Sequence, residues 1–154
     1  MDADRPLSIV TVTCADSEAA ARWLFRAEAV HRQLRDRLPP GFDAYRAALA
    51  RVLAGGARLS LATVDETVEG LALWRIVDNT YELRRLYVDD LVVEAACRSR
   101  GVGHALIAWL EREARALSCA ALALDSGVQR NGAHRFYFRE GFSIPAFCFR
   151  KTLA

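Results

Sequence analysis

The stretch that decides the fold of this chain reads Arg98-Ser99-Arg100-Gly101-Val102-Gly103. It follows the apolar, β-branched run Leu91-Val92-Val93 and precedes a helical pattern from His104 to about Ala116. A strand, a glycine turn and a helix start in this order can cradle an anion such as pyrophosphate, because the first N–H groups of a helix have no partner within it. The glycines allow close backbone approach, and the arginines add charge-assisted donors. The alternative is that the glycines only permit a tight turn and close helix packing.

The composition is typical of a globular protein and excludes several other classes. The length of 154 residues predicts one domain, and the hydrophobic fraction of 53% argues against disorder. The net charge of +2, carried by scattered arginines, does not indicate nucleic-acid binding. No apolar stretch is long enough to span a membrane, and the start Met1–Pro6 lacks the pattern of a signal peptide, so we expect a cytoplasmic protein. The four cysteines are isolated, so we expect them to be reduced and predict no metal site.

Hydrophobic periodicity predicts alternating strands and helices of the α/β (α+β) class. We expect a mixed, twisted sheet of about six to seven strands flanked by helices. The glycine-turn helix should lead by a right-handed crossover into a strand parallel to the one before it. The predicted strands are 7–12, 58–64, 68–77, 81–93, 120–124 and 144–153, and the predicted helices run from an Asp16 or Ser17 cap to about 34, and over 43–53, 104–116 and 132–140.

Two further stretches give the glycine turn its meaning. Tyr87-Val88-Asp89-Asp90-Leu91-Val92-Val93 leads into it, and Arg130–Phe142 follows the next strand. Together these stretches resemble the GNAT superfamily, the acetyl-CoA-dependent N-acetyltransferases. The family's Arg/Gln-x-x-Gly-x-Gly/Ala motif and its later Asn-x-x-Ala, Phe/Leu-Tyr and Gly-Phe motif are matched at Arg98, Gly101, Gly103, Ala133, Phe136, Tyr137, Gly141 and Phe142.

The resemblance implies a single GNAT-like domain over residues 1–154. Helices over about 16–54 would lie on the acceptor side, and a CoA-binding core would cover about 58–153. Splayed parallel strands would leave backbone groups on which the pantetheine arm of CoA pairs as a false strand along Leu91, Val92 and Val93. The alternative for these three residues is a plain core strand. The pyrophosphate would bind the N–H groups of Arg98, Ser99, Arg100, Gly101, Val102, Gly103 and His104.

Tyr137 is the sharpest catalytic candidate. In the family, a tyrosine here often acts as a general acid that protonates the departing CoA thiolate. A phenol suits that role because its pKa of about 10 keeps it protonated at neutral pH. The alternative is an aromatic core residue like Phe136 and Phe138.

Asp89 and Asp90 are the acidic candidates. Alternation along a strand predicts that one faces the cleft and the other the opposite side. Either carboxylate could accept the amine proton, directly or through water, or hold a cationic substrate. The alternative is a strand-end carboxylate in solvent, or one paired with Arg84 or Arg85.

Several other residues are assigned from their place near the expected cleft. Asp125 and Ser126 end the strand after the glycine helix, where they could bind the substrate or cap a turn. Ala133 belongs to the later motif and joins the expected cofactor contacts. Where the family commonly has an asparagine, this chain has Arg130, so either Arg130 or the displaced Asn131 would contact the cofactor. His134 is interpreted as a solvent-facing histidine, and His31 is given no role.

These features predict an N-acetyltransferase that moves an acetyl group from acetyl-CoA to a small, cationic primary amine. The transfer would be direct, in a ternary complex, with no metal. The alternatives are acetylation of a protein N-terminus or lysine, and a non-catalytic CoA-binding sensor module. We expect no nucleic-acid or membrane partner, and a homodimer is an open option.

Overall fold

The computed structural model describes residues 6–153, which form two compact units. The first ends at Ala123 and the second begins at Leu124. The signal-peptide prediction falls mainly on residues 1–5, which lie outside the described part, and the single-domain assignment stays a prediction. None of the helices within residues 6–153 is long and apolar enough to cross a membrane.

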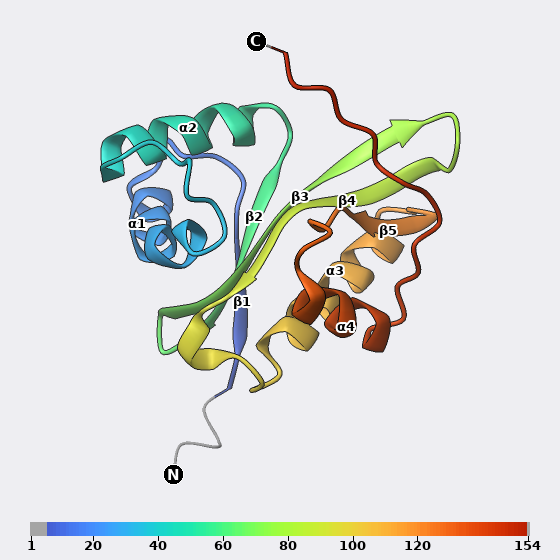
Figure 1. The fold of residues 1–154 in the computed structure, drawn as a ribbon. Helices are drawn as coiled ribbons and strands as arrows, with labels where there is room; N and C mark the ends of the chain where they lie inside the picture. The colour runs from blue at the N-terminus through green and yellow to red at the C-terminus, as the bar shows by residue number, and fades with distance from the viewer. Residues whose placement is uncertain (1–5, 154) are drawn as a thin grey trace. The chain divides into compact units, whose positions relative to one another are not determined.

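A five-stranded sheet in the order β1-β2-β3-β4-β5 forms the centre of the first unit (Figure 1). The first four strands pair antiparallel, and β5 makes the sheet mixed, as predicted. The strands are β1 (Ser8–Val12), β2 (Arg58–Val64), β3 (Thr67–Asn79), β4 (Leu83–Val93) and β5 (Ala121–Leu124). The α/β class is therefore confirmed, and residues 6–153 contain one or two strands fewer than expected.

The strand predicted over 144–153 is wrong, because these residues have no regular secondary structure. Ile144, Phe147 and Phe149 are 66%, 84% and 94% exposed. Alternation favours a strand only where one face is covered, and here the apolar side chains have no such cover.

The helices follow their local signals closely. They are α1 (Glu18–Arg32), α2 (Phe42–Ala54) and α3 (Val102–Ala116) in the first unit, α4 (Asn131–Arg139) in the second, and a short 3-10 turn, η1 (Ala95–Cys97). Ser17 caps α1 as predicted, since its hydroxyl accepts the Ala20 N–H at 3.0 Å. Gly141, at φ +86°, follows the end of α4 as expected of a helix-terminating glycine.

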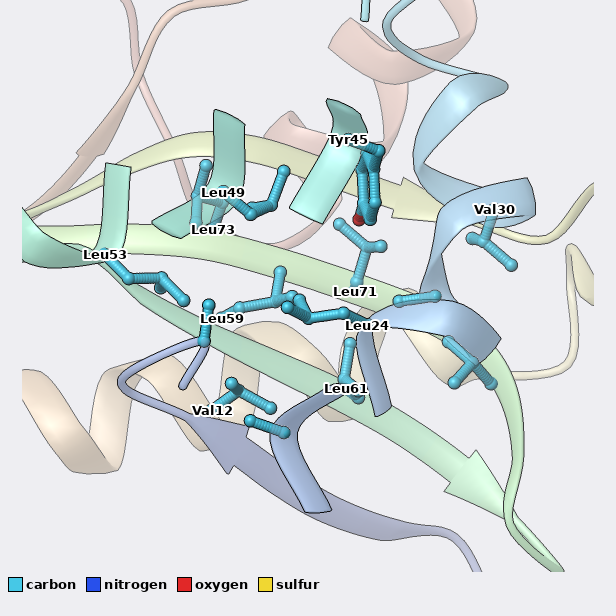
Figure 2. Packing of buried hydrophobic residues seen from close by; sticks show 14 of the residues in the cluster. Val12, Leu24, Val30, Tyr45, Leu49, Leu53, Leu59, Leu61, Leu71 and Leu73 are labelled. Carbon is cyan, nitrogen blue, oxygen red and sulfur yellow. The ribbon is translucent and has the colours of Figure 1, made fainter. Parts of the chain in front are cut away.

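The helices of the first unit cover both faces of its sheet. Helices α1 and α2 lie on one face and α3 on the other (Figure 1). The main core lies between these two helices and the sheet. Its fully buried side chains include Leu24 of α1, Tyr45 of α2 and Leu59 of β2 (Figure 2). On the α3 face, Trp74 stacks edge-on against Trp109 at 5.9 Å and donates to the Ser60 hydroxyl at 2.9 Å.

Candidate functional site

The glycine turn opens α3 in the geometry that an anion cradle needs. Gly101 is the N-cap in the left-handed region, at φ +83°, and Ser99 is also left-handed at +64°. No side chain caps the helix, and the Ala105 N–H to Gly101 carbonyl bond, at 2.9 Å, is the first of the helix. The amides from Gly101 to Gly103 therefore have no partner inside the helix. Arg98 and Arg100 are exposed beside them.

Gly70 on β3 allows α3 to approach the sheet at this end. A Cβ at Gly70 would lie 2.9 Å from Val102 Cγ1, 3.1 Å from the Val92 carbonyl oxygen and 3.2 Å from Leu106 Cδ1. Val102 is the first residue of α3. Gly70 therefore sets the position of the helix start, a role that its isolated place in the sequence did not signal.

The later half of β4 extends beyond β5. The Ala120 N–H donates to the Arg84 carbonyl at 2.8 Å, so β5 starts beside the beginning of β4. A parallel strand of only four residues runs along the first half of an eleven-residue β4. The edge at Leu91–Val93 thus lies past the reach of β5, as a ligand arm would require. Val92 packs in the core, whereas Leu91 and Val93 are half-buried. Residues of the core therefore alternate with more accessible residues along this edge.

A β-bulge at Asp89 breaks the expected alternation of the acidic pair. In the register of β3 and β4, Leu73 pairs with Asp90 and Trp74 pairs with Val88, so Asp89 is the extra residue. The prediction that Asp89 and Asp90 simply face opposite sides is therefore wrong. A bulge depends on the pairing with β3, which the sequence of β4 alone does not reveal.

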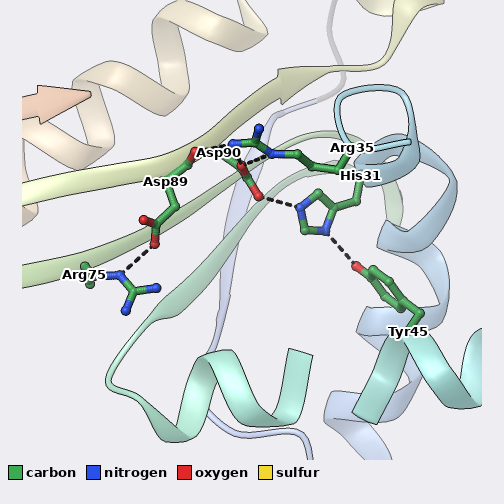
Figure 3. Close-up of polar contacts among 6 residues, drawn as sticks. All are labelled: His31, Arg35, Tyr45, Arg75, Asp89 and Asp90. Carbon is green, nitrogen blue, oxygen red and sulfur yellow. Dashed lines mark hydrogen bonds and ion pairs between the residues drawn. The ribbon is translucent and has the colours of Figure 1, made fainter. Parts of the chain in front are cut away.

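Asp90 is buried at the centre of a hydrogen-bonded chain (Figure 3). His31 Nε2 donates to Asp90 Oδ2 at 2.8 Å, and Arg35 Nε donates to Oδ1 at 2.6 Å. The His31 Nδ1 lies 3.1 Å from the Tyr45 hydroxyl. Because a carboxylate only accepts, Nε2 carries the proton and, in the neutral ring, Nδ1 accepts from Tyr45. His31, given no role from the sequence, is only 1% exposed.

This environment shifts two pKa values. Burial raises the pKa of Asp90, but the hydrogen bonds and charges of His31 and Arg35 outweigh it and leave that pKa below its usual value. Burial, followed by the charge of Glu28, raises the pKa of Tyr45 well above its usual range. Asp90 is therefore a carboxylate and Tyr45 a phenol at neutral pH.

Asp89 makes a different and more accessible pair. Arg75 Nε donates to Asp89 Oδ2 at 2.7 Å, and the Asp89 side chain is 27% exposed (Figure 3). The suggested pairing of the acidic residues with Arg84 or Arg85 is wrong, because those arginines pair with Asp78 at 2.7 Å and Glu82 at 3.5 Å.

In the second unit, Tyr137 lies on α4 among aromatic neighbours. Its ring centroid is 5.4 Å from that of Phe136 and 5.6 Å from that of Phe142. Burial raises the pKa of Tyr137, and the charge of Arg130 only partly opposes this. The phenol is therefore protonated at neutral pH, as a general acid must be. Phe138 is 56% exposed.

The other candidates of the second unit lie at the start of α4 or before it. Arg130 is the N-cap and Asn131 the first helical residue, both exposed, with Ala133 in the first turn. Asp125 is exposed and Ser126 half-buried. His134 is half-buried, and its Nε2 donates to the Gly127 carbonyl at 2.9 Å in an exposed contact.

Two observations concern metals and thiols. All four cysteines are free, and Cys14 and Cys148 are exposed. Within residues 6–153, no three His, Cys, Asp or Glu side chains gather closely enough to hold a metal ion.

Comparisons with known proteins identify the family of the chain. The profile of the acetyltransferase (GNAT) family matches residues 18–142. The uncharacterized N-acetyltransferase YhdJ of Bacillus subtilis is 43% identical over 69 residues, 44% of this chain and 49% of the relative. The aminoalkylphosphonate N-acetyltransferase of Salmonella typhimurium is 39% identical over 66 residues, 43% of each chain. The chain thus spans about half the length of these curated relatives.

A solved structure extends the likeness to the whole fold. The aminoglycoside N-acetyltransferase AAC(6')-Iy in complex with CoA superposes with a TM-score of 0.77 at 20% identity, covering 97% of both chains. The family profile covers most of the sequence, and the chain shares its fold with this solved acetyltransferase. The chain therefore belongs to the acetyltransferase (GNAT) family.

Proposed function

We propose that this chain is an acetyl-CoA-dependent N-acetyltransferase that acts on a small primary amine by direct transfer. The observation that carries the proposal is the uncapped, glycine-led start of α3 at the end of β4, in a chain of this family. Both curated relatives are named N-acetyltransferases, which supports the same activity here.

The residues present suit the groups of CoA. The amides from Gly101 to His104 and the side chains of Arg98 and Arg100 would hold the pyrophosphate, helped by Ser99. The edge at Leu91–Val93 would pair with the pantetheine amides. Arg130 or Asn131, with Ala133, would complete the cofactor contacts. CoA is the ligand of the structural relative described above, which supports this assignment.

The proposed chemistry is one nucleophilic displacement. The amine nitrogen attacks the thioester carbonyl carbon, the carbon–sulfur bond breaks, and an N–H near Val93 stabilises the developing oxyanion. The amine proton passes to Asp89, directly or through water, and the Tyr137 hydroxyl gives a proton to the departing sulfur. Asp89 is the better acidic candidate because its side chain is partly exposed, whereas both oxygens of Asp90 are already bonded.

The acceptor class has two candidates. The first is a cationic metabolite held by acidic side chains, with Asp125 and Ser126 contributing. The second is an amine that also carries an anionic group. It is favoured because Asp89 and Asp90 are each neutralised by an arginine, Arg75 and Arg35. A relative that acts on aminoalkylphosphonates supports the second candidate.

The test is the release of free CoA thiol from acetyl-CoA over a panel of acceptors. The panel holds diamines, aminoalkylphosphonates, aminoglycosides and a peptide with a free N-terminus and a lysine. We expect turnover with a small amine, and the preferred group identifies the acceptor class. Turnover with the peptide alone would favour protein acetylation. CoA binding with no turnover on any amine would refute the enzyme and favour a sensor module.

Two further proposals concern the setting of the protein. We expect it to act in the cytoplasm, and a homodimer is the assembly to test first. Sedimentation of the purified chain distinguishes a monomer from a dimer.

A further inference from the structure

The bulge in β4 is held from outside the sheet by one side chain, Arg35. Its Nε donates to Asp90 Oδ1 at 2.6 Å, and its Nη2 donates to the main-chain oxygen of Asp89 at 2.9 Å. One planar guanidinium therefore bonds both residues of the bulge. It contacts the side chain of Asp90 and the backbone oxygen of Asp89. Arg35 belongs to the loop after α1, so the contact also joins that loop to β4.

Asp90 is fixed on its other side by a buried chain of two residues. His31 on α1 donates to Asp90 Oδ2, and Tyr45 on α2 lies against His31. His31 is 1% exposed and Tyr45 is 0% exposed. The chain therefore ends in the core at Tyr45. Its physical effect is to fix the orientation of the Asp90 carboxylate.

Such a buried polar chain is a costly way to obtain stability alone. An apolar core of the same shape is often as stable as a buried ion pair. What the polar contacts add here is a fixed geometry for Asp89 and Asp90, because Arg35 bonds the main chain of Asp89 and the side chain of Asp90. The residues that follow the bulge at once are Leu91–Val93, the proposed pantetheine edge.

We propose that Arg35, with the His31–Tyr45 chain behind Asp90, is a positioning residue that fixes the β4 bulge and thereby aligns the acetyl-transfer site. The alignment of the acetyl-transfer site rests on the proposed function. The fixing of the bulge rests on the contacts of Arg35 alone. The loop that carries Arg35 thus couples the acceptor-side helices to the strand on which the thioester would lie.

The test compares Arg35→Met with Arg35→Lys and with Arg37→Gln. Arg37 is exposed in the same loop and serves as the matched control. Arg35→Met removes both contacts, whereas a lysine keeps the positive charge but lacks the planar fork that spans the two acceptors. We expect kcat to fall about 10- to 100-fold in Arg35→Met and less in Arg35→Lys, because small misplacements of reacting groups carry such losses. The Kd for CoA should change less than kcat does, because the pyrophosphate contacts at the start of α3 are unchanged and only the Leu91–Val93 edge loosens.

A second readout does not depend on activity. Hydrogen exchange at the amides of Asp90 to Val93 should be faster in Arg35→Met than in the wild type and Arg37→Gln. If kcat and exchange both match the control, the proposal is overturned. If exchange is faster in Arg35→Met but neither the wild type nor any variant transfers acetyl groups, Arg35 does fix the bulge and the proposed function is refuted. Should Arg35→Met not fold, Arg35→Lys decides between the same outcomes.

Discussion

Replacing Gly70 with alanine should loosen the start of α3. The new Cβ would lie 2.9 Å from Val102 Cγ1 and 3.1 Å from the backbone oxygen of Val92. The valine side chain can turn, but the backbone oxygen belongs to a paired strand and cannot yield cheaply. Overpacking of this kind costs about 1–3 kcal/mol. Alanine recovers roughly 0.5–1 kcal/mol of chain entropy in a strand, so the net loss is about 0.5–2 kcal/mol.

Urea unfolding and thermal melting measure this loss directly. The melting temperature should fall by roughly 1–8 °C for a chain of this length. The Kd for CoA should rise in the same variant, because relief of the clash moves Val102 and the amides around it. Gly132→Ala is the control: its Cβ would enter open space in α4, so no loss of stability is expected. A Gly70→Ala protein as stable as the wild type, with unchanged CoA affinity, would refute the close-packing argument.

Three further changes test other parts of the account. Tyr137→Phe should lower kcat by about 100-fold or more with the Kd for CoA unchanged, and equal turnover would remove the general-acid role. Because the pKa of Tyr137 is raised, turnover by the wild type should show no loss from this group below about pH 10. Gly101→Ala should weaken CoA binding by up to roughly tenfold in calorimetry, since alanine resists the left-handed conformation by about 1–2 kcal/mol. Asp90→Asn should cost about 1–3 kcal/mol of unfolding free energy at pH 7.

The Asp90 variant also carries a pH signature. The pKa of Asp90 in the folded protein lies below its unfolded value of about 3.9. The contribution of Asp90 to folding stability is therefore complete above about pH 3.9, and it is lost as the pH falls through the folded pKa. Wild type should therefore lose more stability than Asp90→Asn between pH 5 and the acid limit of about pH 2. Equal slopes in the two proteins would contradict the assignment.

Local signals in the sequence predicted most of the elements. The Ser17 cap, the break at Pro39-Pro40-Gly41 and the Asp65-Glu66 turn all mark boundaries in the structure. The glycine turn was expected to lead into a helix from His104, and α3 does follow it, starting two residues earlier at Val102 with Gly101 as its N-cap. These boundaries could be predicted because each depends on the backbone preferences of a few neighbouring residues.

The contacts of the acidic pair could not be predicted in the same way. Arg35 and Asp90 are 55 positions apart, and their meeting depends on how α1 packs on the sheet. The bulge depends on the β3 register, which no pattern within β4 specifies. His31 did carry a signal: it follows Leu24 and Ala27 at helical spacing, which places it on the buried face of α1.

The central claim is that the glycine turn and the open end of β4 hold acetyl-CoA. Titration of the isotope-labelled chain with CoA, followed by the backbone amide signals, tests it most directly. We expect saturable shifts at Gly101 to His104 and at Leu91 to Val93. Saturable binding whose shifts lie elsewhere, or no binding at millimolar CoA, would contradict the claim.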